Sequence, residues 1–250
     1  MKKKSGDGGR PDVLPGLGVP CAFRPEYLDF DRGIHVGNLN ENERITRILK
    51  QSLETRYGQA FVTERWGRGV YWHWIGFLTR ANREAKPVSS KVSFGCSKFF
   101  LMVDTGEKCA KFGLQVERGM VEPGGEHDRF LLGEDWDWHR LLAALKPRGA
   151  LAKEMERLVM EEEFHIFAGG WRKHPGLISK ENYPGVTKLR QMLENTPKDD
   201  WGGFQLYFRM GEDEVKRSTG LDLVESMLAV FREVTPVMNA CMQAPVAEQE

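Results

Sequence analysis

The sequence has few cysteines, no net charge and no long hydrophobic run. Its four cysteines lack the close pairing of a zinc site and the density of a secreted disulfide scaffold, so we expect reduced thiols and a cytoplasmic protein. Lys plus Arg number 36 and Asp plus Glu number 36, which removes the long-range attraction for polyanions that a basic protein has. No segment approaches the roughly 20 apolar residues that cross a bilayer, which predicts a soluble protein without membrane contact.

The sequence also lacks the motifs that identify common cofactor sites. It contains no phosphate-binding loop, no dinucleotide fingerprint, no zinc-ligand spacing and no repeat of fixed period. We therefore expect no cofactor, and the sequence leaves open whether the chain is an enzyme. Any chemistry has to come from looser groups of residues.

The strongest structural pattern is a β-hairpin between residues 91 and 119. Two apolar runs, 99–103 and 112–116, flank the polar turn 104–108. A hairpin this apolar needs a helix or a second sheet to cover it, which predicts an α+β fold.

Further elements follow from the spacing of the apolar residues. Helices are expected at residues 41–57, 135–145, 150–162, 186–195 and 221–231, and strands at 60–64, 70–78, 163–168 and 203–210. Residues 1–25 are rich in Gly, Pro and charge, which predicts a flexible N-terminal arm. Its apolar residues 13–20 could dock in extended form on the body or on a partner. We predict one globular α+β domain over residues 26–250, with a central, mostly antiparallel sheet covered by helices. The sequence does not decide whether the last two strands join the first sheet.

Aromatic and basic residues concentrate in the expected strand 70–78 and in the loop before it. Strict alternation along a strand places Trp72 and Trp74 on the same face. If they face solvent, they form a stacking platform beside Arg68 for single-stranded nucleic acid or a planar anionic ligand. If they face inward, they belong to the core, since indoles are mostly buried. The sequence leaves the burial of both tryptophans open.

Basic residues also occur on the polar side of the hairpin and in a glycine-rich loop. Lys111 and Arg118 lie on the second arm of the hairpin, where they either contact phosphates or keep a solvated sheet face soluble. Trp171 and Arg172 lie in the loop 169–176, where an indole can stack on a ring and a guanidinium can bind an anion. The predicted ligand-binding set is Arg68, Trp72, Lys111, Arg118, Trp171 and Arg172.

The groupings that could support catalysis are each incomplete. His165 is the best single candidate for proton transfer, and a purely structural histidine is the alternative. A metal-assisted hydrolase acting on phosphodiesters or a small anion could use Asp104 with Glu117, or Asp135 with His139, as metal ligands. Asp135 and His139 are four residues apart and share a helix face, but carboxylates at a helix start are also typical of capping.

A binding face needs only side chains that are present, whereas each catalytic grouping lacks an element. The sequence therefore predicts a non-catalytic soluble binding protein that engages an anionic ligand or a protein partner through an aromatic and cationic surface. Nucleic acid is one form that such a ligand could take. The metal-assisted hydrolase is an alternative. A second alternative is an assembly or interaction subunit that presents its last amphipathic helix or its N-terminal arm to another chain.

Overall fold

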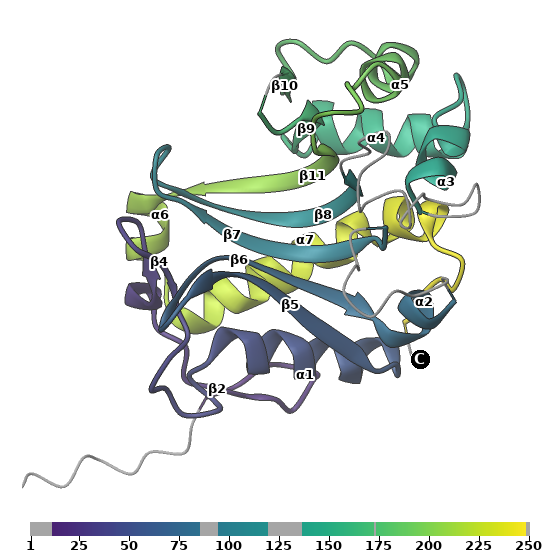
Figure 1. Cartoon of the computed structure of the whole chain (residues 1–250). Helices are drawn as coiled ribbons and strands as arrows, with labels where there is room; N and C mark the ends of the chain where they lie inside the picture. The colour runs from purple at the N-terminus through teal and green to yellow at the C-terminus, as the bar shows by residue number, and fades with distance from the viewer. Residues whose placement is uncertain (1–11, 86–94, 120–136, 173, 249–250) are drawn as a thin grey trace, which may run out of the picture.

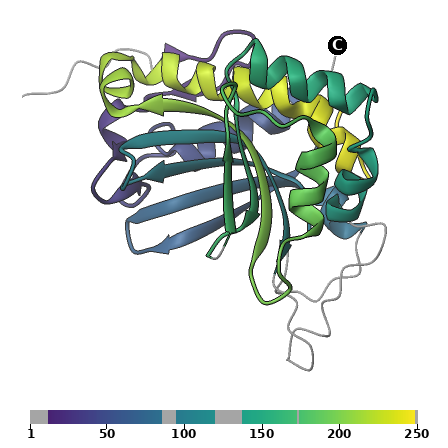
Figure 2. The ribbon, with the colours of Figure 1, turned by 90° about the horizontal axis from the view of Figure 1, so that it is seen from above.

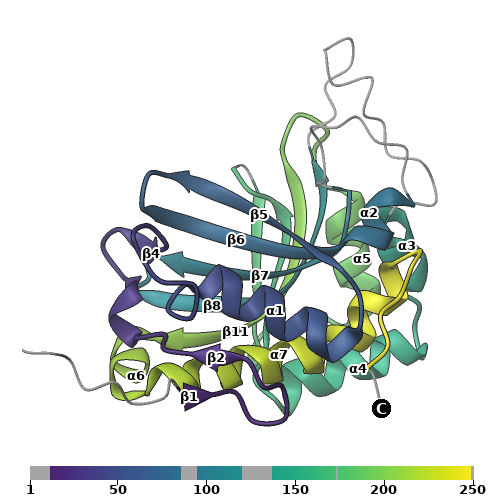
Figure 3. The same ribbon diagram turned by 90° about the horizontal axis from the view of Figure 1, so that it is seen from below.

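The computed structural model describes residues 12–85, 95–119, 137–172 and 174–248. These residues form a large antiparallel β-sheet with helices packed on one of its faces (Figure 1). Figures 2 and 3 show the same layers from above and from below. The predicted α+β fold is therefore confirmed.

The longer helices are amphipathic and bury one side in the core. The helical elements are η1 (Pro25–Tyr27), α1 (Ile45–Tyr57), α2 (Arg80–Glu84), α3 (Asp137–Ala144), α4 (Ala150–Met160), α5 (Val186–Glu194), α6 (Glu212–Arg217) and α7 (Gly220–Cys241). Helix α7 is the central one: it packs against β8 and against α1, α3 and α4. No helix within the described ranges is long and apolar enough to span a membrane.

The strands form one small and one large sheet. Strands β1 (Asp12–Val13) and β2 (Pro20–Cys21) make a two-stranded sheet of their own. The large sheet runs in the order β10 (His174–Ile178), β9 (His165–Gly170), β11 (Gly202–Gly211), β8 (Cys109–Gly119), β7 (Lys98–Asp104), β6 (Tyr71–Thr79), β4 (Gly33–His35) and β3 (Leu28–Asp29), with β5 (Phe61–Arg68) also paired to β6. Because β11 pairs with β8, the two groups of predicted strands belong to a single sheet.

The main core lies between this sheet and the helices. Alternate residues of the central hairpin, among them Phe99 and Phe112, point toward α7 and are completely buried. The Phe99 ring stacks on Phe231 of α7 with 4.9 Å between centroids. Burial of each such side chain stabilises the folded state by about 1.5–3 kcal/mol relative to its exposure. The contacts of this layer therefore hold the helices against the sheet.

The other side of the sheet, which we call the outer face, has a smaller cluster of its own. Phe100, Phe167 and Tyr207 are buried there. The partly buried side chains packed against them are Trp74, Met102 and Trp171. No described helix contributes to this cluster, so the outer face is built from the strands and the residue that follows β9.

A β-bulge in β6 divides the two tryptophans that strict alternation places together. Trp66 lies opposite Trp74 and Gly67 lies opposite Trp72, so His73 is an extra residue on β6. Trp72 therefore packs against the main core, with the Arg65 guanidinium 4.4 Å from its ring, while Trp74 joins the outer-face cluster. The prediction of one shared face is wrong, because the extra residue shifts the alternation by one.

The N-terminal segment packs against the main core. Residues 1–11 lie outside the described part of the chain, but Leu14, Val19 and Phe23 are buried in the main core. Within residues 14–23 the chain is therefore docked on the body of the protein through its apolar side chains and does not form a free arm. Gly220 at the start of α7 makes this packing possible: a Cβ there would lie 1.6 Å from the carbonyl oxygen of Phe23.

Element boundaries differ from the predictions in a few places. Helix α1 begins at Ile45, because the Glu43 carboxylate accepts the backbone N–H of Asn40 (2.9 Å) in a turn that precedes the helix. Strand β10 includes the last three residues of the predicted loop 169–176, and it lies at the edge of the sheet, where its proline is tolerated. All four cysteines are free and buried.

Candidate functional site

The outer face carries a buried lysine between two carboxylates. The ammonium of Lys98 lies 3.0 Å from Glu64 Oε2 and 3.2 Å from Glu117 Oε2, and its side chain is only 1% exposed. Burial opposes the charge, but the carboxylates of Glu117 and Glu64 outweigh it and raise the pKa of Lys98 above its usual value. The Trp201 indole donates to the other oxygen of Glu117 at 3.2 Å. This lysine is neutralised within the protein.

Lys111, a predicted ligand-binding residue, is neutralised in the same way. Its ammonium contacts Asp104 at 2.8 Å and Glu107 at 3.1 Å, and the residue is 6% exposed. Partial burial acts to raise the pKa of the Asp104 carboxyl, but the Lys111 ammonium and two backbone N–H groups lower it below its usual value. Lys98 and Lys111 are therefore both paired with carboxylates and do not form a free cationic surface.

Arg118 serves as a scaffold for the loop before β11. Its guanidinium donates to the carbonyl oxygens of Thr196 (2.6 Å), Pro197 (2.5 Å) and Asp200 (2.8 Å). Arginine carries five N–H donors in a rigid plane, which suits such a multiple contact. Arg118 thus fixes the position of residues 196–200 relative to β8.

Trp171 and Arg172 lie next to the same loop. The Trp171 indole stacks on Phe167 with 4.3 Å between ring centroids, and its backbone N–H donates to Trp201 at 3.1 Å. The backbone N–H of Arg172 donates to the Asp200 carboxylate at 3.3 Å, and its side chain is exposed. The structure therefore brings Arg118, Trp171 and Arg172 to one end of the sheet.

The other three predicted ligand-binding residues lie elsewhere. Arg68 is exposed at the end of β5, Trp72 packs on the helix side, and Lys111 lies at the opposite end of β8 from Arg118. The six residues do not form one surface. Their separation has two causes: the bulge in β6, and the length of β8, which places Lys111 and Arg118 about 23 Å apart along the strand.

His165 lies on the outer face at the start of β9. Its ring stacks on Tyr207 with 5.8 Å between centroids. Burial and the nearby Arg209 guanidinium lower the pKa of its imidazole. A neutral imidazole is a competent base, but its role in proton transfer stays a prediction.

The residues predicted to bind a metal do not converge. Asp104 and Glu117 lie at opposite ends of the hairpin, about 26 Å apart at 3.3 Å per residue, and each carboxylate is held by a lysine. That pair cannot share an ion. Asp135 lies outside the described residues, and His139 is half-buried on α3. The described parts of the chain contain no group of three or more potential metal ligands.

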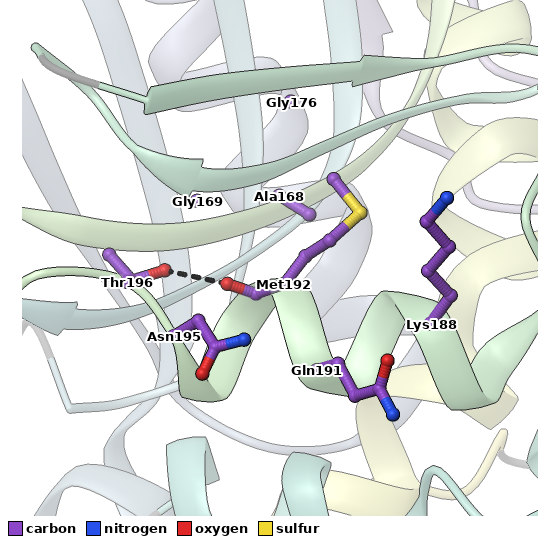
Figure 4. Close-up of a pocket in the computed structure, with 8 residues that line it drawn as sticks. All are labelled: Ala168, Gly169, Gly176, Lys188, Gln191, Met192, Asn195 and Thr196. Carbon is purple, nitrogen blue, oxygen red and sulfur yellow. Dashed lines mark hydrogen bonds between the residues drawn. The ribbon is translucent and has the colours of Figure 1, made fainter.

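A groove that the sequence did not reveal opens between α5 and the β9–β10 hairpin (Figure 4). Its volume is about 510 Å³, which is within the range of small-molecule sites. The lining residues are Ala168, Gly169, Gly176, Lys188, Gln191, Met192, Asn195 and Thr196. In Figure 4 the side chains of Met192 and Lys188 extend from α5 toward the hairpin.

The floor and the rim of the groove differ in chemistry. Met192, Ala168 and the two glycines supply an apolar floor, and a Cβ on Gly176 would lie 2.5 Å from the terminal methyl of Met192. Lys188, Gln191 and Asn195 are exposed polar residues of α5 and the residue after it. The Thr196 hydroxyl is occupied, because it donates to the carbonyl oxygen of Met192 at 3.1 Å. The groove therefore combines one cation and two amides with an apolar surface.

The sequence contains only part of the signal for this groove. Helix α5 was predicted from its apolar spacing, but a groove needs a second wall, and that wall is the unpredicted strand β10. Comparison of the chain with protein-family models, with curated proteins and with solved structures finds no match.

Proposed function

We propose that this chain is a binding protein whose ligand is a small anionic molecule with an apolar part, held in the groove between α5 and β10. The observation that carries the proposal is the charge of the lining: Lys188 is the only charged residue among the eight. No described carboxylate forms an ion pair with it, unlike the lysines of the outer face. Its ammonium is thus available to a ligand anion.

The remaining groups of the groove support the same class of ligand. The amides of Gln191 and Asn195 can donate to carboxylate or phosphate oxygens, and the thioether of Met192 can contact an apolar ring or chain. Pockets that combine an apolar lining with a few polar groups are typical of small-molecule sites. The lining has one titratable side chain and one hydroxyl that is already bonded, which favours binding over catalysis.

The observations favour this proposal over the predicted alternatives. Nucleic-acid binding through the sheet needs unpaired cations, and Lys98 and Lys111 are both paired. A hydrolase using Asp104 and Glu117 needs the two carboxylates close together. We propose neither.

The test is a thermal-shift screen of the intact protein with phosphate, citrate, nucleoside monophosphates and aromatic carboxylates. We expect at least one anion to raise the Tm, because a ligand that binds only the folded state stabilises it. Calorimetric titration of that anion should show a Kd at least about tenfold weaker for Lys188→Gln, since a charged hydrogen bond contributes about 1.5–3 kcal/mol.

The matched control is Arg190→Gln on the same helix. Arg190 pairs with Glu194 at 2.8 Å and does not line the groove, so its replacement changes the net charge equally without changing the site. Equal Kd values for Lys188→Gln and Arg190→Gln would contradict the proposal. So would a screen in which no anion raises the Tm.

A further inference from the structure

Strand β5 forms an edge of the large sheet. It pairs with β6 along Phe61–Arg68, and no other described strand pairs with it. In Figure 3 its outer side faces away from the rest of the sheet. The extra residue of the bulge lies on β6, so β5 itself continues without an insertion. An edge of this kind presents backbone N–H and C=O groups to a further strand.

The most exposed large apolar side chain of the described residues lies on this strand. Trp66 is 69% exposed. It lies opposite Trp74 and therefore on the outer face, with its ring 5.3 Å from that of His73. Exposed tryptophans are enriched among the residues that dominate the energy of protein interfaces.

The two arginines of β5 have no carboxylate partner among the described residues. Arg65 contacts the ring of Trp72 on the helix side of the sheet, and Arg68 is exposed on the same side of the strand as Trp66. The nearest carboxylate on the strand, that of Glu64, forms its ion pair with Lys98 and with neither arginine. The edge therefore carries two available positive charges, one on each side of the strand.

We infer that β5 is a docking strand for an extended acidic segment of another protein, which adds to the sheet as an antiparallel strand. In that pairing, successive partner residues lie opposite Arg68, Gly67, Trp66 and Arg65. The fitting pattern is therefore acidic, any residue, apolar, acidic. The second position faces Gly67, which has no side chain and leaves room for a large residue.

The observations favour a peptide over the other candidates for this surface. Single-stranded RNA would use the indole and the cations, but it cannot form the backbone ladder, and two cations neutralise few phosphates. A second copy of this chain, paired antiparallel with Trp66 opposite Trp66, would place Arg68 opposite Glu64, which is already bound to Lys98. An acidic extended segment can both form hydrogen bonds with the backbone of β5 and pair its carboxylates with the two arginines.

The test is fluorescence anisotropy with a labelled peptide, Thr-Glu-Thr-Phe-Glu-Val-Thr, and its counterpart with lysine in place of both glutamates. We expect the glutamate peptide to bind and the lysine peptide not to bind. Trp66→Ala should weaken binding at least about tenfold, as for a central interface residue. Arg68→Glu should weaken binding of the glutamate peptide and strengthen that of the lysine peptide.

The matched control is Lys153→Glu, an equal charge reversal at an exposed position of α4, which should leave the Kd unchanged. An unchanged Tm of Trp66→Ala would verify that its effect is not one of folding. The inference is overturned if neither peptide binds, if both peptides bind equally or if Trp66→Ala has no effect. It is also overturned if a uridine oligonucleotide displaces the peptide and binds more tightly than the peptide does. The same holds if sedimentation shows that the protein is a dimer and that Trp66→Ala is a monomer.

Discussion

At the scale of single residues, Lys98 and Lys111 of the outer face are each neutralised by two carboxylates. Lys98 forms ion pairs with Glu64 of β5 and Glu117 of β8, which lie on either side of β7. These two pairs offset the free-energy cost of burying the ammonium. Burial of such a group is tolerated only when its partners are in place. Removal of the lysine would leave Glu64 and Glu117 close together without a counter-charge.

Lys98→Ala is expected to lower the free energy of unfolding by about 3–5 kcal/mol, the usual cost of breaking a buried ion pair. Urea denaturation followed by fluorescence measures it. Lys108→Ala is the control: its ammonium contacts Asp31 at 2.5 Å, but the lysine side chain is 46% exposed, so its loss should cost no more than about 1 kcal/mol. Equal losses for the two variants would contradict the assignment of Lys98 to a buried network.

His165 gives the outer face a defined pH dependence. Its pKa is lowered in the folded protein, so the folded state binds this proton more weakly than the unfolded chain does. Its contribution to stability is therefore fully present above the unfolded pKa of about 6.5 and is lost as the pH falls toward the folded value. The free energy of unfolding should therefore fall less between pH 7.5 and pH 5 in His165→Asn than in the unaltered protein, because the variant has no imidazole to protonate. Identical slopes in the two proteins would contradict this.

The sequence shows which residues on the hairpin are polar but not what they contact. Alternation along residues 109–119 correctly separates the apolar from the polar side chains. The partner of Lys98 on the other side is Glu64, which is 34 residues away, and no local pattern specifies that contact. For Lys111, likewise, the sequence identified the basic side chain of the predicted surface but not its pairing with Asp104 and Glu107.

At the scale of elements, local signals were sufficient where a segment is regular. Gly58 ends α1 in the left-handed region with φ of 60°, as its position after the apolar spacing predicts. Helix α7 continues past Pro236 to Cys241, because its buried residues hold it against the sheet. The bulge at His73 and the edge strand β10 were not predicted, because both depart from the regular alternation of apolar and polar residues on which strand prediction depends.

The packing of the N-terminal segment on α7 leads to a prediction about one glycine. Gly220→Ala would place a methyl group against the carbonyl of Phe23, so the segment must move, at an expected cost of about 1–3 kcal/mol. Gly211→Ala is the matched control, because a Cβ there has nothing within 4 Å. Thermal unfolding of both variants measures the difference. A Tm for Gly220→Ala equal to that of Gly211→Ala would show that residues 12–25 are not held in this way.

At the scale of the whole molecule, the two proposed binding sites lie at opposite edges of one sheet. The groove borders β10 at one edge, and β5 is the edge strand on the other side of β6. No local sequence pattern could place them, because the order of the strands depends on pairings such as that of β11 with β8, which joins residues about ninety positions apart. The five strands between the two edges put about 29 Å of sheet between the sites.

This separation predicts that the two sites act independently. Neither site contains a residue of the other, and the sheet between them is continuous and closely packed, so occupation of one site should not change the affinity of the other. The anion that raises the Tm most should therefore leave the Kd of the glutamate peptide within about twofold, and Lys188→Gln should leave that Kd unchanged. Anisotropy titration at saturating anion measures both effects. Competition between the anion and the peptide would mean that they share a site, and it would contradict the assignment of the groove and of β5 to separate ligands.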